Sequence, residues 1–280
     1  MSKSLYTSFL TKRILRPLNR EIKRRGLSPV LKSIIDRKSR DFIINLSKDT
    51  EEVLKNDRVL LICNHPSQVD VLLLLAALPH RSKTFLIIMH NLVSVLPAVN
   101  KHLIPVYIGH RIDSETPHNW KQKLFEKIHF SPEYSPDVAH KKNIKSISLA
   151  TRKIDEGSLV AMFPAGGSKN GRDFLPGVGH IVKDLKFPKK TKIVMAYVSG
   201  TSTWDFFRLI PFLDRFLPRF RIDFSQAFPS TSFSGDSGRK ISQSLQRVYD
   251  NWSLPFEPLP KFQKAALYLR SFFLFLLFRG

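Results

Sequence analysis

The sequence has few residues that cross-link a chain or bind metal. Its single cysteine, Cys63, excludes an internal disulfide, and its place at the end of an apolar run predicts a small buried side chain. The histidines form neither an H-E-x-x-H pattern nor a cluster with cysteine, so we expect no metal site. Apolar packing must therefore hold the fold, and 42% hydrophobic residues in a chain of 280 suffice for a core.

Acidic residues are scarce as well. The chain has 23 Asp and Glu against 45 Lys and Arg, which gives a formal net charge of +22. Such an excess favours an anionic partner: nucleic acid, an acidic membrane surface or a phosphorylated substrate. The sequence has no recognised nucleic-acid-binding motif, and we expect no nucleic acid among its partners.

The two ends of the chain differ in composition. Residues 1–25 lack the uninterrupted apolar run and the small-residue cleavage site of a signal peptide. Their apolar residues fall near helical spacing among lysines and arginines, which predicts a basic amphipathic helix broken near Pro17. The apolar C-terminal run Ala265–Phe278 is shorter than the roughly 20 residues of a spanning helix. We expect it either to anchor shallowly in a membrane or to pack against the domain.

Between these ends, apolar runs alternate with helical segments. The expected strands are Val59–Cys63, Thr84–Ile88, Ile104–Ile108, Leu159–Phe163 and Ile193–Val198. The expected helices are 69–78, 119–129, 140–155 and 238–251. This alternation predicts a single α/β domain with a mostly parallel mixed sheet flanked by helices. We place it at residues 51–235, between an N-terminal basic helical segment (1–50) and a C-terminal helix with an apolar tail (236–280).

The first of these strands leads into a histidine and a carboxylate. His65 is expected in the turn after the strand, and Asp70 in the first turn of the following helix. A carboxylate there can hold one imidazole nitrogen and leave the other to take a proton from a hydroxyl. From the spacing alone, the more usual interpretation is a histidine on the surface and an aspartate that favours the helix dipole.

Two further strands end in basic turns. Gly109, His110 and Arg111 follow one strand, and a glycine-rich loop follows another. The loop contains Gly166, Gly167, Ser168, Lys169 and Arg172. Glycine lets backbone N–H groups approach an anion, and the cations add charge, although the loop matches neither a Walker A nor a dinucleotide-binding pattern. Parallel strands bring their carboxyl ends to one edge, so the three turns are expected to converge.

In this order the turns resemble the sequence blocks of the glycerolipid acyltransferases. Asn64, His65 and Asp70 match the N-H-x-x-x-x-D block, and Ile193–Tyr197 matches the fourth block. The F-P-E-G-T block or its Gly-Gly variant is matched by Phe163, Pro164, Gly166 and Gly167. Ala165 replaces the usual glutamate, and Arg111 comes about three residues later than the usual second-block arginine. The resemblance covers roughly residues 55–200, and its Gly-Gly pair and basic turn are closest to the glycerol-3-phosphate acyltransferases.

The resemblance implies an enzyme of phospholipid biosynthesis. It would transfer a fatty acyl group from acyl-CoA or acyl carrier protein, as co-substrate and without a cofactor, to glycerol-3-phosphate or 1-acylglycerol-3-phosphate. His65 would be the general base and Asp70 would orient its ring. The residues assigned to substrate binding are Asn64, His110, Arg111, Gly166, Gly167, Ser168, Lys169 and Arg172.

The charge and the apolar tail then indicate peripheral or shallow attachment to the cytoplasmic face of an anionic membrane. Two alternatives stay open. One is an acyltransferase for another lysolipid acceptor. The other is a non-enzymatic basic protein that binds membranes or nucleic acid.

Overall fold

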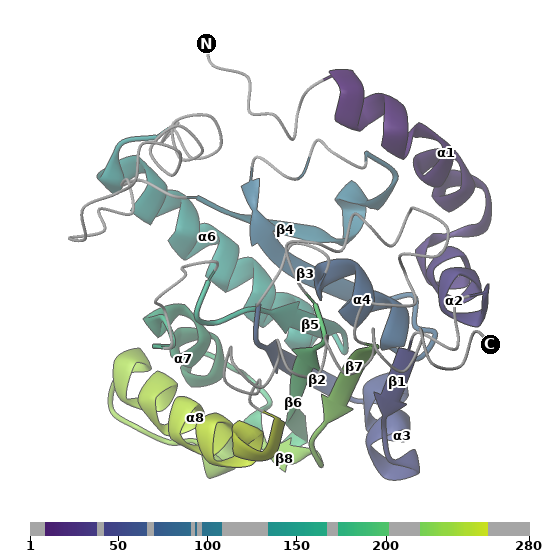
Figure 1. The fold of residues 1–280 in the computed structure, drawn as a ribbon. Coiled ribbons are helices and arrows are strands. Elements are labelled where there is room, and N and C mark those ends of the chain that lie inside the picture. Colours follow the sequence, from purple (N-terminus) through teal and green to yellow (C-terminus); the bar gives the residue numbers. More distant parts are fainter. Residues whose placement is uncertain are drawn as a thin grey trace, which may run out of the picture.

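A single sheet organises the chain. The computed structural model describes residues 9–37, 42–65, 70–90, 93, 97–107, 134–166, 173–201 and 219–256. In this part of the chain, eight strands form one sheet: seven lie in the order β1-β7-β6-β2-β5-β3-β4, and the eighth, β8, pairs with β6 (Figure 1). Their bounds are β1 (Phe42–Asn45), β2 (Arg58–Cys63), β3 (Thr84–Met89), β4 (Leu103–Val106), β5 (Leu159–Met162), β6 (Thr191–Ser199), β7 (Phe220–Phe224) and β8 (Phe228–Pro229).

The sheet is mostly parallel, as predicted. Strands β2 to β6 run in one direction, whereas β7 and β8 are antiparallel to β6, and β1 is parallel to β7. The central strand β2 pairs with β5 on one side and with β6 on the other. Residues Val59–Cys63 are all buried, which is typical of a parallel strand covered on both faces.

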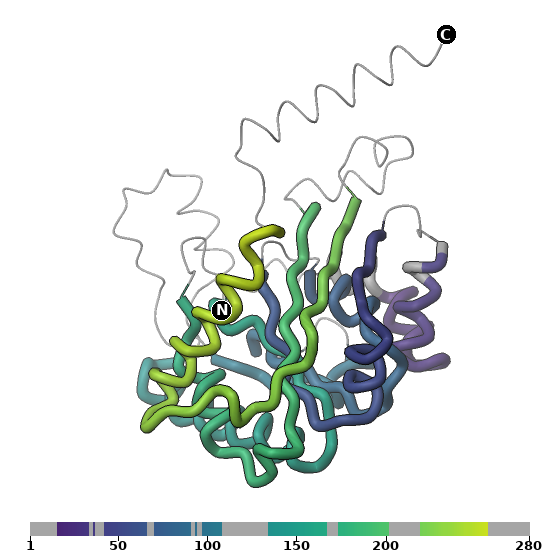
Figure 2. The backbone as a smooth tube through the Cα atoms, turned by 90° about the horizontal axis from the view of Figure 1, so that it is seen from below, coloured from purple at the N-terminus to yellow at the C-terminus, as the bar shows by residue number. Residues whose placement is uncertain are grey.

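Helices cover both faces. They are α1 (Phe9–Arg25), α2 (Leu27–Arg37), α3 (Lys48–Asn56), α4 (Asp70–Ala77), α6 (Pro136–Asp155), α7 (Pro176–Lys183) and α8 (Gly238–Ser253). Short 3-10 turns are η4 (Pro97–His102), η5 (Pro188–Lys190), η8 (Ser230–Ser232) and η9 (Leu254–Phe256). Figure 2 shows α8 alongside the strands on one side of the molecule, and α1 and α2 on the opposite side.

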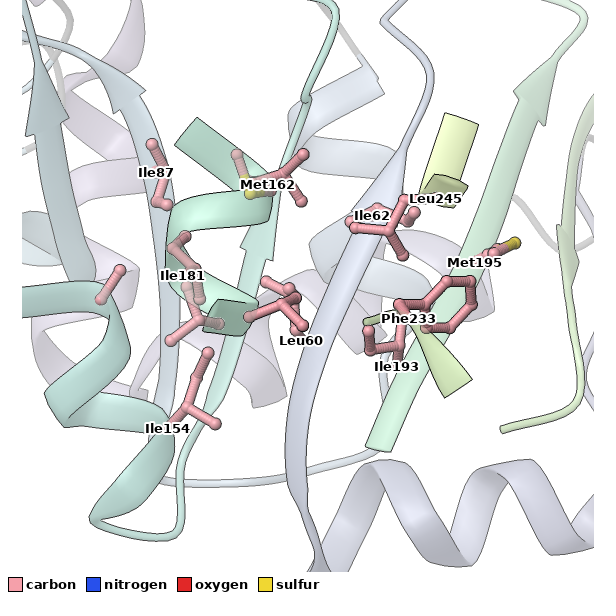
Figure 3. Packing of buried hydrophobic residues seen from close by; sticks show 14 of the residues in the cluster. Leu60, Ile62, Ile87, Ile154, Met162, Ile181, Ile193, Met195, Phe233 and Leu245 are labelled. Atoms are coloured by element: carbon pink, nitrogen blue, oxygen red, sulfur yellow. The ribbon is translucent and has the colours of Figure 1, made fainter. Parts of the chain in front are cut away.

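Alternating side chains of the strands divide the core into two layers. Leu60 and Ile62 of β2 pack with residues of α6, α7 and α8, and Figure 3 shows them in one layer with Ile154, Ile181 and Leu245. The intervening residues, such as Leu61 and Cys63, pack with α3 and α4. Each fully buried Leu or Ile contributes about 1.5–3 kcal/mol relative to exposure, so these layers hold the strands in register.

Most of the expected elements are confirmed. The predicted strands correspond to β2, β3, β4, β5 and β6, and the predicted helices 69–78, 140–155 and 238–251 correspond to α4, α6 and α8. Helix α6 begins earlier than predicted, at Pro136, because proline suits the first helical turn. Segment 119–129, Ile108 and the run Ala265–Phe278 lie outside the described residues.

One expectation about the N-terminal helix is wrong. Helix α1 continues through Pro17 and ends at Arg25. The break comes at Gly26, whose N–H donates to the Ile22 carbonyl at 2.9 Å and whose φ of 86° favours glycine. Among the helices that the structure describes, none has both the length and the apolarity needed to cross a bilayer.

Candidate active site

The site lies where three adjacent parallel strands end. The register pairs Cys63, the last residue of β2, with Ala196 of β6, and pairs Ile62 with Met162, the last residue of β5. Strand β6 continues past this point to Ser199. The turns that follow these strands therefore share one edge of the sheet. In open α/β sheets this is the edge at which ligands bind.

His65 and Asp70 are in contact at this edge. The distance from His65 Nδ1 to Asp70 Oδ2 is 3.3 Å, and the side chain of Asp70 is fully buried while that of His65 is 24% exposed. Asp70 is the first residue of α4, where the helix dipole favours a negative charge. A buried carboxylate thus faces one side of a solvent-accessible imidazole, as the spacing of the two residues predicted.

The imidazole also contacts the end of β5. The rings of His65 and Phe163 stack with centroids 4.6 Å apart and an interplanar angle of 28°. Phe163 is the first residue of the predicted F-P-E-G-T-like block. The ring of His65 therefore contacts both Asp70, at the start of α4, and Phe163, directly after the neighbouring strand β5.

Asn64 connects the same turn to β6. Its Nδ2 donates to the Val198 carbonyl at 2.8 Å, and its Oδ1 accepts from the Val198 N–H at 2.7 Å. Its own N–H donates to the hydroxyl of Tyr249 at 3.0 Å. The amide thus acts as a further pairing partner for β6 beyond the last backbone pair of β2, whereas the sequence placed Asn64 among the substrate-binding residues.

The glycine-rich loop begins at the same edge. The Gly166 N–H donates to the Phe163 carbonyl at 3.0 Å, which forms a tight turn directly after β5. The Leu175 N–H donates to the Pro164 carbonyl at 2.9 Å, so the beginning and the end of the loop lie together. The remaining predicted binding residues, Gly167, Ser168, Lys169, Arg172, His110 and Arg111, lie outside the described residues.

Two groups near the pair are held in their neutral forms. Burial raises the pKa of the Cys63 thiol well above its usual value, and the charge of Asp70 raises it further. Burial likewise raises the pKa of the Tyr249 hydroxyl. Cys63 is only 2% exposed, which confirms the prediction of a small buried side chain and argues against a nucleophilic thiolate.

Sequence reasoning did not identify Tyr249. It lies on α8, 185 residues from Asn64, and its four-residue spacing from Leu245 and Ile241 is that of an ordinary core-facing helix position. Within the residues that the structure describes, no group of three His, Cys, Asp or Glu side chains is placed to hold a metal ion.

Comparison with known proteins identifies a family for this chain. A family model described as Acyltransferase matches residues 45–199, more than half of the chain. No curated protein sequence matches. Among solved structures, the chain is similar to the 1-acyl-sn-glycerophosphate (LPA) acyltransferase PlsC from Thermotoga maritima. That similarity covers 86% of this chain and 84% of the other, at 13% sequence identity and a TM-score of 0.45. The family match includes Asn64, His65 and Asp70 and ends with β6, so that α8 lies beyond it.

Proposed function

The chain belongs to the acyltransferase family, and we propose that it esterifies a glycerophosphate hydroxyl with a fatty acyl group taken from a thioester. The proposed donor is acyl-CoA or acyl carrier protein, and the proposed acceptor is glycerol-3-phosphate or 1-acylglycerol-3-phosphate. The observation that carries the proposal is the contact between His65 and the buried Asp70 at the carboxyl edge of the sheet.

In the proposed mechanism, His65 is the general base. Its Nδ1 faces Asp70, so Nε2 is the nitrogen that takes the proton of the acceptor hydroxyl. The hydroxyl oxygen attacks the thioester carbonyl, the C–O bond forms and the C–S bond breaks. The proton on Nε2 then passes to the departing sulfur, which leaves as a thiol. Asp70 orients the ring and stabilises the imidazolium, and its burial strengthens that interaction.

The two basic turns are proposed to bind the phosphate of the acceptor. The turn at Gly166 supports this role because the Gly166 N–H donates to the carbonyl of Phe163, whose ring stacks on His65. The glycine-rich loop therefore starts next to the proposed base. Backbone N–H groups of such a loop, together with Lys169 and Arg172, suit an anion next to the reacting hydroxyl. His110 and Arg111 would add charge from the segment after β4, a strand that β3 separates from β5.

We further propose that the protein acts at the cytoplasmic face of an anionic membrane, to which it attaches peripherally. Helix α1 supports this proposal because it exposes Arg16, Arg20 and the run Lys23–Arg25. Each cation near an anionic lipid surface contributes about 1 kcal/mol of attraction. Attachment would also bring the site to the lipid substrates.

Replacement of the proposed base tests the mechanism. We expect His65→Ala to lower kcat by about 10²–10⁴-fold, because general-base catalysis typically contributes that much. A matched control is His80→Ala, since His80 is exposed and precedes β3 at the opposite edge of the sheet. Steady-state acyl transfer should distinguish the two, and urea unfolding should show that both are folded. Near-normal transfer by folded His65→Ala would refute the assignment.

Product analysis tests the acceptor. Glycerol-3-phosphate, 1-acylglycerol-3-phosphate and a lysolipid without a terminal phosphate monoester are offered together, once with acyl-CoA and once with acyl carrier protein. Mass spectrometry should find the products of a phosphorylated glycerol in excess. Preferential acylation of the third acceptor would contradict the proposed phosphate recognition.

A further inference from the structure

We propose that Tyr249 is a positioning residue for the acyl transfer. Its hydroxyl would set the position of His65 through the backbone of Asn64. The inference rests on the proposed function of His65 and adds a residue on α8, beyond the part of the chain that matches the family.

The hydroxyl of Tyr249 lies at the end of the β2–β6 ladder. It accepts from the Asn64 N–H at 3.0 Å and donates to the Ala196 carbonyl at 2.8 Å. Cys63 and Ala196 form the last backbone pair between the two strands. A single phenol oxygen therefore contacts β6 and the first residue after β2, one residue before His65.

The tyrosine itself has little freedom to move. It is 5% exposed, and its ring lies 5.4 Å from that of Phe174 and 5.7 Å from that of Trp252, between centroids. Leu245 on the same helix is fully buried in the core layer beneath β2 and β6 (Figure 3). Because burial raises the pKa of the hydroxyl, it keeps the proton that it donates to Ala196.

Beyond Cys63 the turn depends on side chains for its position. The amide of Asn64 bonds Val198, and the hydroxyl of Tyr249 bonds the Asn64 N–H. These contacts hold Asn64 from two directions and so define where the following residue begins. Loss of the hydroxyl leaves the amide in place but lets the peptide before His65 tilt, and a misplacement of about 1 Å at a reacting group can cost on the order of 10²-fold in rate.

The test compares two variants that each lose one buried hydroxyl bonded to a carbonyl. Tyr249→Phe removes the contact with Asn64. Thr191→Val is the control, since Thr191 is fully buried at the opposite end of β6 and donates to the Phe187 carbonyl at 3.0 Å. We expect urea unfolding to show similar losses of stability. Only Tyr249→Phe should lower kcat, by about tenfold or more, with little change in KM for either substrate.

A double-variant cycle separates positioning from a general loss of stability. In a His65→Ala background, Tyr249→Phe should cause little further loss of the residual rate, because its effect acts through the imidazole. Equal kcat values for Tyr249→Phe and Thr191→Val, or a full further loss in the His65→Ala background, would overturn the inference. Near-normal activity of His65→Ala would instead overturn the proposed function, so the two failures are distinguishable.

Discussion

At the scale of single residues, the end of β2 combines a buried thiol with a buried carboxylate. Cys63 and Asp70 are both within the core, and His65 lies between them in the sequence at its surface. Burial and the charge of Asp70 raise the pKa of the thiol, so the folded protein favours its protonated form. This preference makes part of the stability dependent on pH.

We expect alkaline conditions to reveal this preference. In the unfolded chain the thiol ionises near its ordinary pKa of 9.0, whereas in the folded protein it stays protonated to higher pH. This contribution to the free energy of unfolding is fully present below the pKa of 9.0 in the unfolded chain, and it is lost as the pH rises from there towards the higher pKa of the folded protein. Between pH 7 and pH 10, the free energy of unfolding should fall by about 1.4 kcal/mol more in the wild type than in Cys63→Ala. Urea unfolding at both pH values measures the difference, and equal falls would contradict it.

At the scale of elements, the contact between α7 and α8 is very close. The Gly179 N–H donates to Ser242 Oγ at 3.0 Å, and a Cβ at Gly179 would lie 1.8 Å from the Gly238 carbonyl oxygen. No side chain fits between the two helices at this point. Because α8 carries Tyr249, this contact also defines the distance of that tyrosine from the end of β2.

A methyl group at this contact should therefore be costly. We expect Gly179→Ala to destabilise the fold by about 1–3 kcal/mol more than Gly177→Ala, because overpacking against backbone forces the helices apart. At Gly177 the added Cβ meets the side chain of Ile147, with its Cδ1 atom at 3.2 Å, and this end of the side chain can rotate away. Urea denaturation of both variants measures the difference. Similar costs would show that α7 and α8 separate without penalty.

At the scale of the whole molecule, we expect one part of the surface to use the net charge of +22 to bind a membrane. The helices α1 and α2 pack together and against η4 through Ile22, Val30 and Val99, on the side of the molecule away from α8 (Figure 2). The last turn of α1 exposes Lys23, Arg24 and Arg25. This surface is the one we expect to meet anionic lipid.

A vesicle-binding experiment can test whether this surface binds lipid better than a second cluster of three lysines with equal charge. We expect sedimentation with vesicles of anionic phospholipid, weaker binding at high salt, and none with zwitterionic vesicles. Replacing Lys23, Arg24 and Arg25 by Gln should weaken binding by about 10²-fold, since each cation contributes about 1 kcal/mol. The control replaces exposed Lys186, Lys189 and Lys190 by Gln, at the amino end of β6. Equal weakening would assign the binding to net charge alone.

Several elements followed from the sequence because their signals are local. The continuous apolar run predicted β2 to within one residue, and helical periodicity predicted α6 and α8. The strands β1 and β7 were missed: each is short, and they pair with one another across a sequence separation of about 178 residues. Helix α7 was missed because two glycines in Pro176–Lys183 oppose helix formation in isolation.

The candidate site likewise has one part that follows from local sequence and one part that depends on distant contacts. His65 and Asp70 are five residues apart, so one strand, one turn and one helix start are enough to bring them together, and the sequence by itself determined that pair. The hydroxyl of Tyr249 reaches Asn64 only because α8 packs against the face of β2 and β6 at one particular position along these strands. That contact joins residues 185 positions apart, and no local pattern specifies it. Tertiary packing alone decided which side chain supports the turn that carries the histidine.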